Sequence, residues 1–250
     1  MPGRDTNIGA KRARETRAQL ALEDEAPATC LLTRVEQDLG IPVVVAALPA
    51  GIAGCCWREG ERVVLWVDGV QAVVRRRFTL AHELGHVRCG HGGRVDVDRW
   101  STLAGTTSYA REVQANAFAA ELLAPAAGVR ASAAREPTLD DVVRIAARYG
   151  ISAIAAVHRL GTLELTRRAA TLRREVEQGL AEAVRARLAP PEVHDVLAAI
   201  DERALPRLSP ALADGALASL RDRTSSLAAA AGAAGCEPAR LASGAHAIGV

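Results

Sequence analysis

Two histidines four residues apart carry the clearest chemical signal in this sequence. They lie in the segment His82-Glu83-Leu84-Gly85-His86. On an α-helix, positions four apart share one face, so both imidazoles can reach one metal ion with Zn–N bonds of about 2.0–2.1 Å. Glu83 stands beside the first ligand and can act as a general base toward a water molecule at the metal. The segment therefore predicts a catalytic zinc site of the kind that hydrolyses peptide bonds.

A catalytic zinc needs a third protein ligand, and four residues are candidates. Glu112 lies beside the apolar face of a predicted helix, where a carboxylate is costly unless it meets a positive charge. Glu121 competes, but its position near the helix end favours a solvated charge. Cys89 and His91 closely follow the histidine helix, yet that helix ends there and directs them elsewhere. The pattern favours Glu112.

Further side chains are candidates for supporting roles. Asn116 follows Glu112 by four residues on the same flank, where it can orient a zinc-binding histidine. The oxyanion formed during peptide hydrolysis needs a donor besides zinc. Tyr109 is the first choice for that donor, ahead of Arg111 and His91, although no motif fixes any of the three.

The elements that must position these groups alternate between strands and helices. Apolar, β-branched runs predict a strand over 41–48 and a hairpin whose second strand is 62–68. That second strand can pair with an extended substrate above the metal. A helix over 73–88 carries the histidines, an irregular excursion follows over 94–108, and a helix over 109–123 carries Glu112. The predicted fold class is α+β, with a short mixed or antiparallel sheet packed on the histidine helix.

Four regions are expected along the chain. Residues 1–26 are polar and charged without a convincing apolar stripe, which predicts a flexible N-terminal arm that is mobile or loosely helical. A zinc metallopeptidase domain over 27–135 precedes a helix-turn-helix-like hairpin over 136–162 and a helical C-terminal region over 163–250, with further helices at about 163–188, 191–203 and 210–232. The second hairpin helix, Ala153 to Leu160, has few basic or amide side chains. We therefore favour a hairpin packed on the peptidase over direct DNA binding.

Composition excludes several classes of protein. The chain has 250 residues and a net charge of +2, which gives no global case for nucleic-acid binding. Its five scattered cysteines suit free thiols in a reducing cytosol better than a disulfide framework. The N-terminus lacks the apolar core of a signal peptide, and prolines and glycines interrupt the uncharged stretch 39–57. We expect a cytoplasmic protein without a membrane segment.

Two segments resemble the ImmA/IrrE family of bacterial metallo-endopeptidases. The first is Arg77-Phe78-Thr79-Leu80-Ala81-His82-Glu83-Leu84-Gly85-His86. The second, Glu112 to Pro125, is similar to the family signature Glu-x-x-Ala-Asn-x-Phe-Ala-Ala-x-Leu-Leu-x-Pro. The resemblance covers about residues 29–160. It implies that His82, His86 and Glu112 bind zinc and that Glu83 is the catalytic base. Gln114 stands where the family often has an acid, and Ala124 replaces its usual Met.

The resemblance also implies a biological role. Members of the family commonly cleave or otherwise disable helix-turn-helix repressors, and so induce mobile-element or stress-response genes. We therefore expect an endopeptidase that binds one Zn²⁺ and acts on such a repressor. Two alternatives stay open: a transcriptional regulator that uses the scaffold without proteolysis, and a partner-binding or toxin–antitoxin component that docks through its helical C-terminal part.

Overall fold

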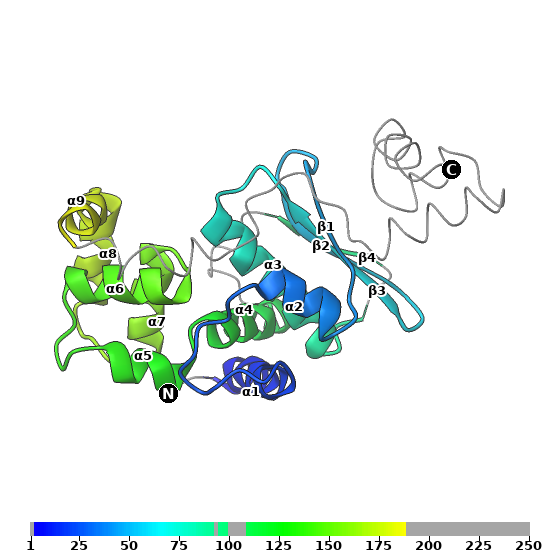
Figure 1. Cartoon of the computed structure of the whole chain (residues 1–250), viewed down its shortest axis with the longest axis horizontal. Coiled ribbons are helices and arrows are strands. Elements are labelled where there is room, and N and C mark those ends of the chain that lie inside the picture. Colours follow the sequence, from blue (N-terminus) through cyan, green and yellow to red (C-terminus); the bar gives the residue numbers. More distant parts are fainter. Residues whose placement is uncertain (1–2, 93–94, 100–108, 189–250) are drawn as a thin grey trace.

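The computed structural model describes residues 3–92, 95–99 and 109–188, which Figure 1 draws as coloured ribbons. A small sheet stands beside a set of helices, which confirms the α+β class. In chain order the elements are α1 (Arg4–Gln19), α2 (Leu31–Gln37), β1 (Val43–Ala46), β2 (Ile52–Glu59), β3 (Arg62–Asp68), α3 (Val73–Arg88), β4 (Val95–Arg99), α4 (Ala110–Leu123), α5 (Ala126–Ser132), α6 (Leu139–Tyr149), α7 (Ala153–Thr162), α8 (Ala169–Glu177) and α9 (Leu180–Arg187).

The described strands form one mixed sheet in the order β1-β3-β2-β4. β1 is parallel to β3, whereas β2 is antiparallel to both of its neighbours. The hairpin of β2 and β3 is confirmed, but the excursion expected over 94–108 is wrong in part, because residues 95–99 form β4. This segment alternates Val and Asp at the sheet edge, where a strand pairs on one side only and tolerates alternating charges. Residues 100–108 lie outside the described chain.

Three helices stack successively on this sheet. α3 packs against β2 and β3, α4 packs against α3, and α1 packs against α4 (Figure 1). α3 and α4 both contribute to the apolar core, and their fully buried side chains include Leu84, Phe118 and Leu122. The helix that carries the two histidines is therefore held between the sheet and the helix that carries Glu112.

Residues 4–19 form the regular helix α1, within the segment 1–26 for which the sequence predicts a mobile or loosely helical arm. The buried face of α1 consists of small or polar residues, namely Gly9, Ala13, Thr16 and Arg17. Such a face lacks the apolar stripe by which an amphipathic helix is recognised. Polar contacts contribute to its attachment, since the Arg17 guanidinium donates to the carbonyl of Leu122 at 2.8 Å, near the end of α4.

The hairpin of α6 and α7 forms where it is expected. Thr138 begins α6 in a capping box, with its backbone N–H and its hydroxyl both 2.8 Å from the carboxylate of Asp141. Ser152 begins α7 and accepts a hydrogen bond from the N–H of Ala155 at 3.1 Å. Buried Arg77 of α3 donates to the carbonyl of Gly150 at 3.2 Å, which ties the turn between α6 and α7 to the helix that carries the two histidines.

The helix expected over 163–188 is divided. α8 and α9 are separate helices, and Gly179 between them has a φ of +79°, a conformation that interrupts a helix. The helices expected at 191–203 and 210–232 lie outside the described residues. Within the described chain, no helix is long and apolar enough to cross a bilayer.

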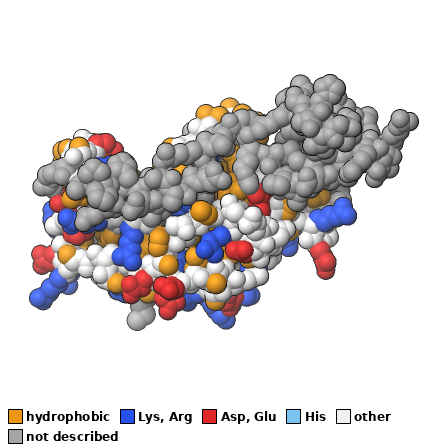
Figure 2. Space-filling view, in the orientation of Figure 1, with side chains coloured by type: hydrophobic (Ala, Val, Ile, Leu, Met, Phe, Trp, Pro, Cys, Tyr) orange, Lys and Arg blue, Asp and Glu red, His pale blue; other side chains and the backbone are white. Residues whose placement is uncertain are grey.

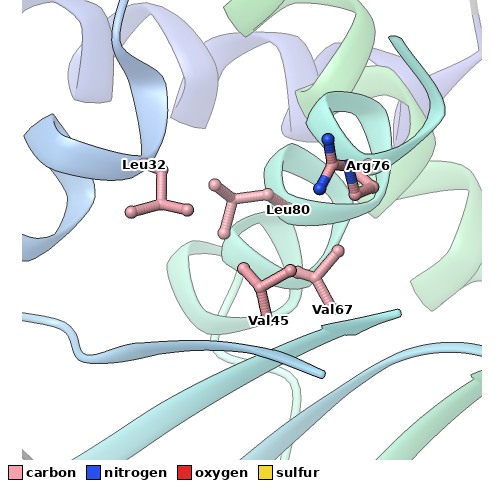
Figure 3. Close-up of a pocket in the computed structure, with 5 residues that line it drawn as sticks. All are labelled: Leu32, Val45, Val67, Arg76 and Leu80. Atoms are coloured by element: carbon pink, nitrogen blue, oxygen red, sulfur yellow. The ribbon is translucent and has the colours of Figure 1, made fainter. Parts of the chain in front are cut away.

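A small cavity lies between α2, the sheet and α3 (Figure 3). Its volume is about 20 Å³, which suffices for about one water molecule. Five side chains line it: Leu32, Val45, Val67, Arg76 and Leu80. Leu80 precedes His82 by two residues and so points about 200° away from it around the helix. The cavity is therefore a packing gap and not a substrate pocket.

Candidate metal centre

α3 buries the whole motif in the interior. His82 and Glu83 are 0% exposed and His86 is 2% exposed. The Nε2 atoms of the two histidines lie 3.0 Å apart. The four-residue spacing thus brings both ring nitrogens to one point, as the helical geometry predicts.

α4 brings the carboxylate of Glu112 to the same point. Glu112 Oε2 lies 3.4 Å from His82 Nε2, and its Oε1 lies 3.6 Å from His86 Nε2. The two helices approach closely at Gly85, where a Cβ would stand 3.1 Å from the Cα of Ala115. One ligand atom from each of the three residues lies within 4.8 Å of the others, so the expected third ligand reaches the two histidines.

The donor set fits a tetrahedral divalent metal. Ligand atoms at about 2.0–2.1 Å from a tetrahedral zinc stand about 3.3 Å apart, close to the 3.0, 3.4 and 3.6 Å found here. Glu112 Oε2 is buried and accepts no hydrogen bond within the described residues. A carboxylate buried in this way is costly unless a cation meets it. The three side chains are therefore arranged to hold a metal.

A family comparison agrees with this geometry. Residues 36–161, about half of the chain, match the peptidase family described as the IrrE N-terminal-like domain. The chain belongs to this family. The match confirms the resemblance inferred from the two motifs, and it includes all three potential ligands of the IrrE-like site. A search of curated proteins found no match.

β2 lies directly against the general-base candidate of the IrrE-like site. A Cβ on Gly54 would stand 2.4 Å from Oε1 of Glu83 and 2.7 Å from the methyl carbon of Thr79. Two hydrogen bonds fix this strand on α3: Thr79 donates to Gln71 at 3.1 Å, and Gln71 donates to the carbonyl of Ala53 at 2.8 Å. The carboxylate of Glu83 is therefore held between its own helix and a strand that has no side chain at the contact.

Asn116 occupies the place expected for a residue that orients a ligand. Its Oδ1 lies 2.9 Å from Nδ1 of His82. Since an amide oxygen only accepts, Nδ1 of His82 carries the proton, and the Nε2 of neutral His82 presents a lone pair toward Glu112. The geometry supports the predicted orienting role of Asn116, which leaves the metal-facing nitrogen available for coordination.

His91 does not point away from the site, contrary to expectation. Its Nδ1 lies 2.9 Å from Nδ1 of His86, on the side of that ring opposite the metal cluster. Gly90 ends α3 with a φ of +72°, and the N–H of His91 donates to the carbonyl of His86 at 3.0 Å. With the bond from the N–H of Gly90 to the carbonyl of Val87, this is a Schellman motif, which folds the third residue after the helix back onto its last turn. A glycine followed by histidine at the helix end was the signal available in the sequence.

The two other candidates for the third ligand have different roles. Burial raises the pKa of the Cys89 thiol to about 11. Among the described residues, the cluster whose ligand atoms converge consists of His82, His86 and Glu112, and Cys89 is not part of it. The sequence predicts a solvated Glu121, but this carboxylate is buried and pairs with Arg159 of α7. An acid near the end of α4 meets the hairpin rather than solvent, a tertiary contact that local sequence does not reveal.

Tyr109 stands at the N-terminal end of α4, where its side chain is 76% exposed. It lies three residues before Glu112 and so begins the helix that brings this ligand to the site. This position alone does not decide whether Tyr109 acts as an oxyanion donor, so this role stays a prediction. The same holds for Arg111.

Proposed function

We propose that this chain is a zinc-dependent endopeptidase that cuts a regulatory protein, namely a helix-turn-helix transcriptional repressor. The convergence of His82, His86 and Glu112 beside buried Glu83 carries the catalytic part of this proposal. Membership of the IrrE-like peptidase family supports the same reaction. The repressor as substrate rests on the family resemblance of the motifs.

The chain's own residues divide the catalytic work. A zinc ion held by His82, His86 and Glu112 supplies Lewis acidity, which polarises a substrate carbonyl and lowers the pKa of water. Glu83 takes a proton from the attacking water at its carboxylate and passes it to the amine of the leaving peptide. Asn116 keeps the Nδ1 proton of His82 in place throughout, so that the Nε2 lone pair stays directed at the metal.

An extended substrate segment needs a strand edge, and β3 does not offer one. β3 pairs with β1 on one side and β2 on the other, so the pairing with substrate expected for residues 62–68 is wrong. The edge strand nearer to Glu83 is β4, because it pairs with β2, whose Gly54 lies against this carboxylate. We place the substrate along the outer edge of β4.

A protein partner suits the described surface better than DNA. Basic and acidic side chains are interspersed over the described part of the face in Figure 2. Within α7, the exposed positions include His158 and Thr162 but no lysine or arginine, since Arg159 is buried. A helix that reads DNA needs exposed basic or amide side chains, so the hairpin is better suited to packing on the peptidase.

Two variants test the reaction. Glu83→Gln removes the base but none of the three ligands, so it should keep zinc and lose proteolysis. His82→Ala removes a ligand and should lose both. Zinc content by atomic absorption and cleavage on denaturing gels give the two readouts. Full cleavage by Glu83→Gln would sink the proposed mechanism.

A purified helix-turn-helix repressor tests the substrate, and a repressor found encoded next to this gene would be the first to use. We expect the zinc-loaded protein to cut it and the Glu83→Gln protein to leave it intact. A repressor that stays whole, but releases its operator when the parent protein is added, would favour the non-proteolytic regulator. Casein is a poor substitute, because a peptidase dedicated to one protein leaves it uncut.

A further inference from the structure

We propose that the N-terminal helix α1 is part of the metal centre, with Asp5 as a positioning residue that sets the tautomer of His86. This inference rests on the proposed metal site. It concerns a helix outside the segment that matches the family, since α1 ends at Gln19 and the match begins at residue 36. The juxtaposition behind it is a chain of hydrogen bonds from α1 to the ligand.

Three hydrogen bonds connect Asp5 to His86. Asp5 Oδ1 accepts from Nε2 of Gln114 at 2.7 Å. Oε1 of Gln114 lies 3.0 Å from Nε2 of His91. Nδ1 of His91 lies 2.9 Å from Nδ1 of His86. All three distances are within the normal range for hydrogen bonds, and together they connect the first turn of α1 to a metal-binding ring.

The direction of every link follows from Asp5. A carboxylate only accepts, so Gln114 turns its NH₂ to Asp5 and its carbonyl oxygen to His91. That oxygen also only accepts, so Nε2 of His91 carries a proton and its Nδ1 is the acceptor in the neutral ring. Nδ1 of His86 must then donate, which leaves the lone pair of its Nε2 directed at His82 and Glu112. The carboxylate thus selects the tautomer of His86 that can bind a metal.

The packing of α1 holds Asp5 in place for this task. At Gly9, α1 and α4 are so close that a Cβ on this glycine would stand 2.1 Å from the backbone oxygen of Gln114. Arg88, which ends α3, donates to the hydroxyl of Thr16 at 3.1 Å. α1 is therefore attached both to the helix that carries Gln114 and to the helix that carries His86.

The competing interpretation is that Asp5 only favours the start of α1, where acidic side chains complement the helix dipole. The two interpretations predict different effects of substitutions at position 5 on zinc affinity. A dipole effect changes the stability of α1 with little effect on zinc. A tautomer effect depends on a hydrogen-bond acceptor at position 5, so Asn can replace Asp but Ala cannot.

The experiment measures zinc affinity of the full-length protein by competition with a chromophoric chelator. Loss of an outer hydrogen-bond partner of a metal ligand costs about 10–100-fold in metal affinity. We expect His91→Ala to lie within this range and Asp5→Ala near its lower end, because it acts through two intermediate side chains. Asp5→Asn should bind zinc nearly as tightly as the parent, since its amide oxygen still accepts.

Lys11→Ala is the matched control, because Lys11 lies on the exposed side of the same helix in a surface ion pair with Glu15. It should leave zinc affinity unchanged. Thermal unfolding of the metal-free proteins shows whether each variant folds as the parent does. The visible spectrum with Co²⁺ reports the geometry at the metal, and we expect it to shift in Asp5→Ala but not in Lys11→Ala.

Three results would overturn the inference: an Asp5→Ala protein that binds zinc as tightly as the parent, an Asp5→Asn protein as weak as Asp5→Ala, or a zinc loss matched by equal loss of metal-free stability. A parent protein that binds no zinc would instead contradict the proposed function. The two failures are therefore distinguishable.

Discussion

Each histidine of the metal centre uses one ring nitrogen for a neighbouring side chain and turns the other toward Glu112. His82 is held by Asn116, and His86 by His91. This division fixes both rings before any metal binds, so little conformational entropy is lost on coordination. The four-residue spacing predicts that His82 and His86 share one face of α3, whereas the orientation of their rings depends on residues from α4 and from the segment after α3.

Adding one methyl group at Gly54 tests how precisely the carboxylate of Glu83 must be positioned. Gly54→Ala would place a Cβ 2.4 Å from Glu83 Oε1 and 2.7 Å from the Thr79 methyl carbon, so the carboxylate or the strand must move. Displacement of a catalytic group by about 1 Å can cost about 10²-fold in rate. We expect kcat for repressor cleavage to fall by about that factor while zinc content stays at the parent level.

Gly161→Ala is the matched control for this substitution. Its Cβ would meet the Cβ of Ala169 at an ordinary 3.5 Å, within a helix where alanine is favoured. It should leave kcat unchanged. Unaltered turnover in Gly54→Ala would contradict the close fit described for Glu83.

At the scale of elements, α4 makes a different contact at each of its two ends. Glu112 in its first turn reaches the histidines of α3, and Glu121 near its last turn pairs with buried Arg159 of α7. Arg159 also donates to the carbonyl of Ala124 at 2.8 Å. The helix-turn-helix-like hairpin is thereby anchored to the helix that supplies the third ligand.

Removing one partner of this buried pair should destabilise the fold. Glu121→Ala leaves the guanidinium of Arg159 buried without its carboxylate, and such losses cost about 3–5 kcal/mol. Urea unfolding of the metal-free protein measures the change. For comparison, Glu177→Ala breaks the surface pair with Arg173, in which both side chains are 54% exposed, and should change stability by less than about 1 kcal/mol. Equal effects in the two variants would contradict an anchoring role for Glu121.

The elements differ in how readily sequence predicts them. The bounds of α3 agree with the helix predicted at about residues 73–88, because the spacing of the two histidines indicates a helix and Gly90 marks its end. α1 was not, since its buried face is small and polar and its helix is recognised only through its contacts with α4. Glu121 shows the same limit, because its burial depends on α7, which lies more than thirty residues away in the chain.

At the scale of the molecule, the metal centre joins parts of the chain that are far apart in sequence. The family match begins after α1 and ends within α7. α1 nevertheless reaches the site through Gln114, and α7 reaches the ligand-bearing helix through Glu121. The convergence of His82, His86 and Glu112 could be predicted from two short motifs. The supports from α1 and α7 could not, because they arise from packing between separate segments.

In the proposed site, two imidazoles and one carboxylate hold the metal. X-ray absorption at the zinc edge of the loaded protein tests this arrangement directly. We expect two imidazole nitrogens and oxygen ligands at about 2.0–2.2 Å, and no sulfur at about 2.3 Å. The Glu112→Ala protein should bind zinc more weakly than the parent. A sulfur scatterer, which would implicate a cysteine such as Cys89, or a third imidazole, which would implicate His91, would contradict the assignment of Glu112.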